Sequence, residues 1–213
     1  MIQTQDRIEK LLMTIDILGV AKIKHLQKIN DLKSYRNACY AVKKLDGFIN
    51  ETYVNKEKVI YLNKAGRELI GSSKEVKKTL LIEHSLLRNE VYLYFNCPVD
   101  WKTEYPTEIE IKAPSPLEMR IKGLKAISKK KIVSDAAFVR NGYLHLIEID
   151  NTRNMSDNKK KIELYAEIIP SLKQHVPVLF FFTISEVRKR KLEEMCKGKG
   201  FRYQIKTYRE IGG

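Results

Sequence analysis

Three carboxylates lie close together in a short stretch of this sequence, between residues 132 and 150. Asp135 stands inside the apolar segment IVSDAAFVR, and Glu148 and Asp150 end the segment YLHLIEID. In a β-strand, residues two apart face the same side, so Glu148 and Asp150 are expected on one face of a sheet. Carboxylates at short separation repel each other unless a cation lies among them, and hard divalent cations prefer oxygen ligands. The pattern predicts a binding site for Mg²⁺ or Mn²⁺, of the kind that a metal-dependent phosphodiesterase uses.

The two acidic segments are joined by the dipeptide Asn141-Gly142. Asn-Gly between alternating apolar runs is the strongest short-range signal for a β-hairpin. We therefore expect paired strands over residues 132–140 and 143–150, an arrangement that brings the three carboxylates to one edge of the hairpin.

A helix is expected after this hairpin, and it carries three lysines followed by a tyrosine. Lys161 and Tyr165 are four residues apart, so they share a face of that helix. Farther on, an apolar run over 177–183 suits a strand covered on both faces, followed by a basic helix over 186–197 and a last strand over 201–207. This succession predicts a mixed α/β sheet for the second part of the chain.

Asp on one strand, followed by Glu-x-Lys on the next, is the signature of the PD-(D/E)XK nuclease superfamily, and the chain resembles it here. Asp150 stands where that family has Lys, so a lysine from the following helix is expected to replace it, with Lys161 the first choice and Lys159 the second. The resemblance implies that Asp135 and Glu148 hold the metal. It also implies that Asp150 is a further ligand or orients the water, and that Lys161 stabilises charge in the transition state.

A plainer explanation of the same acids is structural. Asp135 could cap a turn or pair with Arg140, and Glu148 could pair with a lysine across the sheet. We also expect His145 to be structural, because its position, three residues before Glu148, places it on the other face of the strand.

The first 71 residues follow the order helix, helix, helix, strand, strand. Apolar spacing predicts three helices and then two strands, over 8–18, 21–29, 32–45, 48–54 and 58–62. Asp31 is the expected cap of the third helix, whose buried side should include Tyr35. This order is typical of a winged helix-turn-helix domain, in which the third helix enters the major groove and the strand hairpin forms the wing.

Arg36 and Asn37 on the third helix are the predicted base readers, because Arg suits guanine edges and Asn suits adenine edges. Phosphate contacts are expected from lysines of this helix, of the wing and of a basic stretch before the Asp135 strand: Lys33, Lys43, Lys56, Lys58, Lys129, Lys130 and Lys131. Two alternatives stay open. Any surface helix has a polar face, and winged helices also bind proteins.

The pattern divides the chain into a winged-helix domain over 1–71 and a nuclease-like α/β domain over 72–213. A long helix over 72–95, capped by Ser72-Ser73, is expected to link them, and the segment 98–116 is expected to be mostly irregular. With a winged helix in front, the chain resembles the replication-relaxation family of plasmid and other mobile-element proteins. The resemblance rests on the helix-turn-helix pattern, on SDAAF, and on LIEID followed by K-x-x-x-Y. It implies a role in plasmid DNA replication or relaxation.

Composition favours a polyanionic partner. The chain has 213 residues, a net charge of +14 and a pI near 9.6, and both halves carry more Lys and Arg than Asp and Glu. No run of 18 apolar residues and no signal-peptide pattern occurs, so we expect a cytoplasmic protein without a membrane partner. The three cysteines are widely spaced and odd in number, which favours free thiols over a disulfide framework or a zinc site.

The leading hypothesis is a protein that binds double-stranded DNA and whose second domain nicks or cuts DNA with Mg²⁺ or Mn²⁺. The rival hypothesis is a non-catalytic regulator of replication or transcription, in which the carboxylates are structural and the second domain mediates homodimers or partner contacts. RNA binding is a third, weaker alternative.

Overall fold

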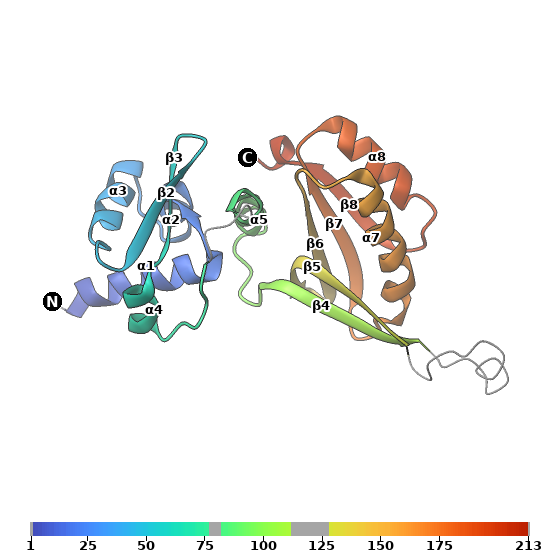
Figure 1. The fold of residues 1–213 in the computed structure, drawn as a ribbon, viewed down its shortest axis with the longest axis horizontal. Helices are drawn as coiled ribbons and strands as arrows, with labels where there is room; N and C mark the ends of the chain where they lie inside the picture. The colour runs from blue at the N-terminus through green and yellow to red at the C-terminus, as the bar shows by residue number, and fades with distance from the viewer. Residues whose placement is uncertain (1, 77–81, 112–127, 213) are drawn as a thin grey trace. The chain divides into compact units, whose positions relative to one another are not determined.

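The chain folds into two compact units, Met1–Cys97 and Pro98–Gly213, in the computed structural model (Figure 1). The structure describes residues 2–76, 82–111 and 128–212. Each unit combines α-helices with a β-sheet, so the expected mixture of helices and strands is present. The division after Cys97 differs from the break after residue 71 that the sequence suggested.

Unit 1 contains five helices in its described part and a three-stranded antiparallel sheet in the order β1-β3-β2. The helices are α1 (Ile2–Leu18), α2 (Ile23–Ile29), α3 (Tyr35–Lys43), α4 (Lys64–Ile70) and α5 (Ile82–Tyr94), and the strands are β1 (Ala21–Lys22), β2 (Ile49–Val54) and β3 (Glu57–Leu62). The expected order of three helices and two strands is present, with the short β1 added between α1 and α2. Fully buried apolar side chains from the helices and β3 form its core, among them Leu12, Ile15, Leu26 and Ile60.

Helix α3 begins later than the sequence indicated, at Tyr35 instead of residue 32. Ser34 is its N-cap, since the Ser34 Oγ accepts a hydrogen bond from the Asn37 backbone N–H at 3.2 Å. Asp31 adopts a left-handed φ of 48° and does not cap the helix. The expectation that Tyr35 is buried is also wrong: the side chain is 55% exposed, because Tyr35 lies at the first position of the helix.

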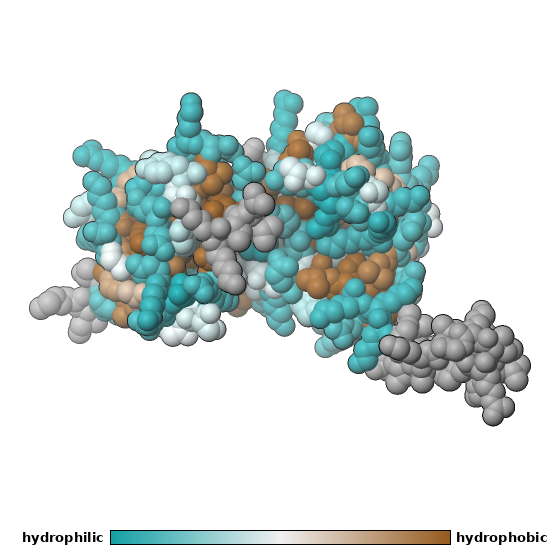
Figure 2. All heavy atoms as spheres, viewed as in Figure 1, coloured by the Kyte–Doolittle hydropathy of each residue, from teal (hydrophilic) through white to brown (hydrophobic). Residues whose placement is uncertain are grey.

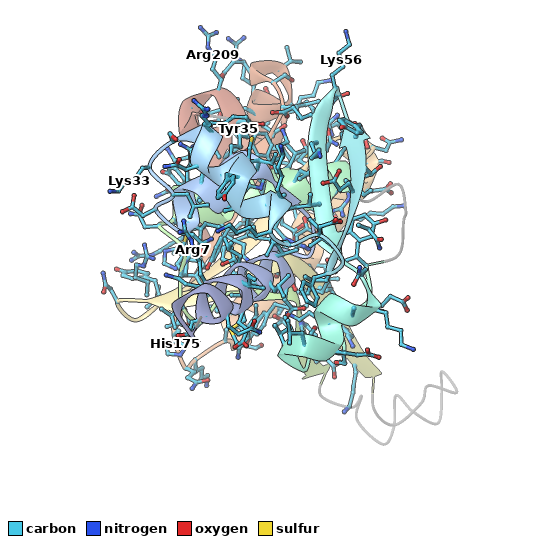
Figure 3. The ribbon with its side chains drawn as sticks, turned by 90° about the vertical axis from the view of Figure 1, so that its left-hand side faces the viewer. Arg7, Lys33, Tyr35, Lys56, His175 and Arg209 are labelled. Atoms are coloured by element: carbon cyan, nitrogen blue, oxygen red, sulfur yellow. The ribbon has the colours of Figure 1, made fainter. Side chains whose placement is uncertain are left out.

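Strands β2 and β3 form the hairpin expected for a wing. Val54 pairs with Glu57, and the two residues between them, Asn55 and Lys56, have φ values of 49° and 65°. Two consecutive left-handed residues match the twist of a tight hairpin turn. Lys56 therefore lies at the tip of the hairpin (Figure 3).

The linking helix expected over 72–95 is shorter than predicted. Residues 72–76 are not helical, and the described helix α5 begins at Ile82. Ser72 does not cap this helix, because its hydroxyl instead donates to the Asp16 carboxylate at 2.5 Å. Helix α5 belongs to unit 1, where the buried Asn89 side chain donates to the Val20 carbonyl at 2.6 Å.

Unit 2 is a five-stranded mixed sheet in the order β4-β5-β6-β7-β8. Its strands are β4 (Lys102–Ile111), β5 (Ser128–Arg140), β6 (Tyr143–Asp150), β7 (Val176–Thr183) and β8 (Arg202–Thr207). β4, β5 and β6 pair antiparallel, whereas β6, β7 and β8 pair parallel. The β5–β6 hairpin with its turn at Asn141-Gly142 is confirmed, and so are the later strands and helix.

Helices α7 (Met155–Ile168) and α8 (Glu186–Cys196) cover one face of this sheet (Figure 1). Apolar side chains from both helices and from the strands form a common core, including Leu146, Ile162, Phe181 and Leu192. Each helix starts at a polar cap, since Asn154 Oδ1 accepts from Ser156 N and Ser185 Oγ accepts from Arg188 N. The two caps fix where the basic helices begin relative to the sheet.

The segment after Pro98 is more regular than expected, because β4 is a ten-residue strand. Pro106 lies inside it, opposite Val133 of β5. Proline lacks a backbone N–H, and β4 tolerates it because this strand is at the edge of the sheet. Residues 112–116 of the segment that was expected to be irregular lie outside the described residues.

Polar side chains dominate the visible surface of each unit, with smaller hydrophobic areas between them (Figure 2). The three cysteines are free thiols, as expected. No helix in the described part of the chain combines the length and apolar composition needed to cross a lipid bilayer.

Candidate active site and nucleic-acid interface

The carboxylates of unit 2 lie where β5 and β6 stop pairing. The ladder between these strands runs from Arg140↔Tyr143 to Ala136↔Ile147 and ends there. At the next position the Asp135 carboxylate accepts a hydrogen bond from the Ile149 backbone N–H at 2.6 Å. The Asp135 carboxylate thus takes the place of a backbone carbonyl as the hydrogen-bond acceptor between β5 and β6. Both Asp135 and Glu148 are buried at this position.

Glu148 is at the centre of this cluster, and its side chain is only 1% exposed. The Lys161 Nζ lies 2.5 Å from one carboxylate oxygen, and the Tyr165 hydroxyl donates to the other at 2.5 Å. The guanidinium of Arg153 lies 3.6 Å from the oxygen that contacts Lys161. The structure therefore brings Lys161, the predicted replacement for the missing motif lysine, into direct contact with Glu148.

Tyr165 connects Glu148 to β5. Its hydroxyl also lies 2.8 Å from the Ser134 Oγ, and both Ser134 and Tyr165 are fully buried. Because Tyr165 follows Lys161 by four residues on α7, one face of this helix supplies both contacts to Glu148. We call Ser134, Asp135, Glu148, Lys161 and Tyr165 the acid cluster.

Opposing influences act on the Glu148 carboxyl group. Burial raises its pKa to about 8, and the negative charge of Asp135 adds to this increase. Lys161 and the Tyr165 hydroxyl act in the other direction, but their effect is smaller. Burial, together with the charge on Glu148, also raises the pKa of Tyr165 well above its ordinary value. Tyr165 therefore acts as a hydrogen-bond donor.

Asp150 belongs to a different set of contacts. Both of its oxygens are bound by Arg188, at 2.7 Å and 2.6 Å, which is a bidentate pair. Asn158 and Thr183 donate to the same carboxylate at 2.7 Å and 2.8 Å. Although burial opposes ionisation, these hydrogen bonds lower the pKa of Asp150. The structure thus gives Asp150 a role in joining β6, β7, α7 and α8, and we do not retain it as a metal ligand.

Arg153 and Arg188, which lie near the acids, were not singled out from the sequence. Arg188 lies on α8, and its Nη2 also donates to the Arg153 carbonyl at 2.6 Å. Nothing in the sequence links Arg188 to Asp150, because the pair forms only when α8 packs on the sheet. Asn158, by contrast, could have been found, since Asn158, Lys161 and Tyr165 follow helical spacing on one face of α7.

Asp135 and Glu148 remain as a two-carboxylate donor set. Within the described residues, no group of three or more His, Cys, Asp or Glu side chains is arranged to hold a metal ion. Mg²⁺ is commonly held by one or two carboxylates, with waters and substrate phosphates completing its octahedral shell. The Asp135–Glu148 pair fits that donor chemistry, whereas a site built from protein ligands alone would need more oxygens than the pair provides.

The predicted DNA-reading residues lie on the exposed side of α3. Lys33, Arg36, Asn37 and Lys43 are all exposed (Lys33 is labelled in Figure 3). Between α3 and the β2–β3 hairpin, the expected wing, lies a groove of about 640 Å³. We call it the wing groove, and its lining includes Lys22, Tyr35, Lys43, Tyr53, Lys56 and Lys58.

Some predicted phosphate-binding lysines already have acidic partners. Lys58 lies 2.6 Å from Glu51 on the neighbouring strand. In β5, Lys130 pairs with Glu167, and Lys131 pairs with Glu108 at 3.1 Å. Lys129 also takes part in an interaction. The ion pairs of Lys130 and Lys131 reduce the positive charge that these two lysines offer to a phosphate backbone.

No protein-family model, curated protein or solved structure matches the chain.

Proposed function

We propose that this chain binds double-stranded DNA through α3 and the β2–β3 hairpin of unit 1. The observation that carries the proposal is the exposed polar side of α3 beside a lysine-lined groove that ends at the hairpin. An α-helix fits the major groove of B-DNA, which is about 12 Å wide. With α3 in that groove, Arg36 and Asn37 face base edges, and Lys33, Lys43 and Lys56 face the phosphate backbone.

The test is a fluorescence titration of labelled DNA duplexes at several salt concentrations. We expect the logarithm of affinity to fall linearly with the logarithm of salt concentration, since each neutralised phosphate releases counterions. Changing Arg36 and Asn37 to Ala should flatten the preference among sequences, whereas changing Lys56 to Ala should weaken binding to all sequences alike. Affinity that does not respond to salt would contradict the proposal.

A second function is supported by the position of Lys161 in unit 2. We propose that the acid cluster hydrolyses phosphodiester bonds in DNA, with Asp135 and Glu148 holding Mg²⁺ or Mn²⁺. When bound, such an ion supplies Lewis-acid polarisation of a phosphate and lowers the pKa of a water ligand. Lys161 places a positive charge beside the metal-binding carboxylate, where negative charge builds up on the phosphoryl oxygens. Tyr165 orients Glu148 by donating a hydrogen bond to it.

Purified protein, supercoiled plasmid and a panel of divalent ions test this second function. We expect nicking only when Mg²⁺ or Mn²⁺ is present. Glu148→Gln preserves the size of the side chain but removes its charge, so nicking should be lost while duplex binding by unit 1 persists. Lys161→Ala should slow nicking, and Lys159→Ala on the exposed side of the same helix is the matched control. Intact plasmid with every ion would leave the non-catalytic regulator as the function of unit 2.

A further inference from the structure

A second groove borders α3 on the side opposite the wing. It has a volume of about 380 Å³ and lies between α1 and α3. We call it the α1 groove, and its lining consists of Arg7, Ile8, Leu11, Asn37, Tyr40, Ala41 and Lys44. Neither the prediction from the sequence nor the proposed wing contacts includes Arg7 or Lys44.

The two grooves lie on opposite sides of α3 because of helical geometry. Successive residues of an α-helix are separated by about 100° around its axis. Tyr35 and Cys39 line the wing groove, whereas Asn37 and Ala41 line the α1 groove. The exposed Arg36 lies between these two sets around the helix. Figure 3 views the face of unit 1 on which Arg7, Tyr35 and Lys56 lie.

Among the described residues that line the α1 groove, two are cationic, Arg7 and Lys44, and none is acidic. Arg7 is exposed, and neither Arg7 nor Lys44 forms an ion pair within the described part of the chain. Lys44 Nζ lies 4.9 Å from the centre of the Tyr40 ring, which holds the ammonium group at the end of α3. The wing groove differs, since its lining includes the carboxylates of Glu51 and Glu57.

We propose that the α1 groove binds the second phosphate backbone of the duplex, with Arg7 and Lys44 as its phosphate contacts. A helix in the major groove has one sugar–phosphate strand on each side. The wing groove takes one strand, and the α1 groove takes the other. Asn37 at the rim of the α1 groove then lies between base edges and backbone. This inference rests on the proposed DNA binding, and it adds a clamp on the side away from the wing.

The experiment compares Arg7→Ala/Lys44→Ala with the wild-type chain in duplex titrations over a range of salt concentrations. We expect affinity to fall about 10- to 100-fold near 0.1 M salt, equally for all sequences, and the salt slope to decrease by about 2. The control is Lys64→Ala/Lys74→Ala, which removes the same charge from α4 and from residue 74 and should change affinity much less. Circular dichroism confirms that both variants are folded.

The outcomes separate this inference from the proposed function. If the wild-type chain binds no duplex, the proposed function fails and the clamp fails with it. If the wild-type chain binds and the Arg7/Lys44 variant binds with the same affinity and salt slope, only the clamp is overturned. A fluorescent mononucleotide provides a further arm. Micromolar mononucleotide binding that Arg7→Ala/Lys44→Ala abolishes, with duplex affinity unchanged, would make the groove a small-ligand site and also overturn the inference.

Discussion

The carboxyl group of Glu148 is buried beside a second acid, yet it is in contact with a lysine, a tyrosine and an arginine. Lys161 and the Tyr165 hydroxyl favour its ionisation, whereas burial and the negative charge of Asp135 oppose it more strongly. A group in this position responds strongly to any cation that enters the site. In the proposed nuclease function, Lys161 and the bound metal ion would therefore share the Glu148 carboxylate.

The raised pKa of Glu148 predicts how stability depends on pH in metal-free buffer. The folded protein keeps the Glu148 proton up to about pH 8, whereas the unfolded chain loses it near the ordinary value of 4.5. The contribution of this group to stability is therefore complete below pH 4.5 and declines as the pH rises towards 8. Urea unfolding at several pH values should show this decline in the wild type and not in Glu148→Gln. Glu163→Gln, an exposed change on α7, should behave as wild type, and identical slopes for all three would contradict the raised pKa.

Arg188 is predicted to stabilise the fold by neutralising Asp150. Arg188→Met leaves a carboxylate buried without its bidentate partner, which should lower the free energy of unfolding by about 3 kcal/mol. Asp150→Asn/Arg188→Met removes both charges, and we expect it to be more stable than Arg188→Met alone. Lys189→Met, which affects a pair between partly exposed side chains, should cost less than about 1 kcal/mol. Chemical denaturation measures all three, and a double variant less stable than the single one would contradict the role of the charge pair.

At the scale of elements, α5 completes the core of unit 1. Leu86 of α5 packs with Val20 and Val59, and Ile82 contacts the same cluster. Two polar contacts fix its position, since Asn89 donates to the Val20 carbonyl and Glu90 Oε1 lies 3.1 Å from His25 Nε2. The helix that we expected to link two domains is therefore part of the first one.

The Glu90 contact should make unit 1 sensitive to acid. Burial opposes ionisation of Glu90, but the hydrogen bond from His25 and the nearby Lys24 lower its pKa to about 2. A lowered pKa stabilises the fold above the ordinary value near 4.5, and this stabilisation is lost as the pH falls towards 2. Glu90→Gln should therefore be less stable than wild type at pH 6, and the difference should shrink by pH 3. Glu83→Gln, an exposed change on α5, is the control, and a Glu90→Gln difference that stays constant with pH would contradict the proposed linkage.

At the scale of the whole molecule, the chain consists of two units that each have their own core. We expect the fragments 1–97 and 98–213 each to unfold cooperatively in urea, as followed by circular dichroism. Fragment 1–71 lacks α5 and exposes Val20 and Val59, so it should unfold at a clearly lower urea concentration than 1–97. Equal midpoints for 1–71 and 1–97 would show that α5 contributes nothing to the first unit.

Local patterns in the sequence determined much of this molecule. The Asn141-Gly142 turn, the alternation of β5 and β6, and the helical spacing of Lys161 and Tyr165 are short-range features, so they could be predicted without the fold. For the same reason the β2–β3 hairpin and the order of the helices in unit 1 were expected correctly. The spacing of Lys161 and Tyr165 also predicted that both lie on the same face of α7. In the structure, Lys161 on this face contacts Glu148.

Long-range packing decided the rest. The sequence predicted Asp150 as a third metal ligand, but in the structure Arg188 of α8 binds its carboxylate. This pair could not be predicted, because no spacing rule connects residues on separate elements. The α1 groove likewise exists only because α1 crosses beside α3. Helix α5 joined unit 1 through Asn89 and Glu90, whose partners are distant in the chain. The tertiary fold determines which groups surround a buried carboxylate. The role of that carboxylate therefore depends on the fold, because the free energy of a buried charge depends on the charges and hydrogen bonds around it.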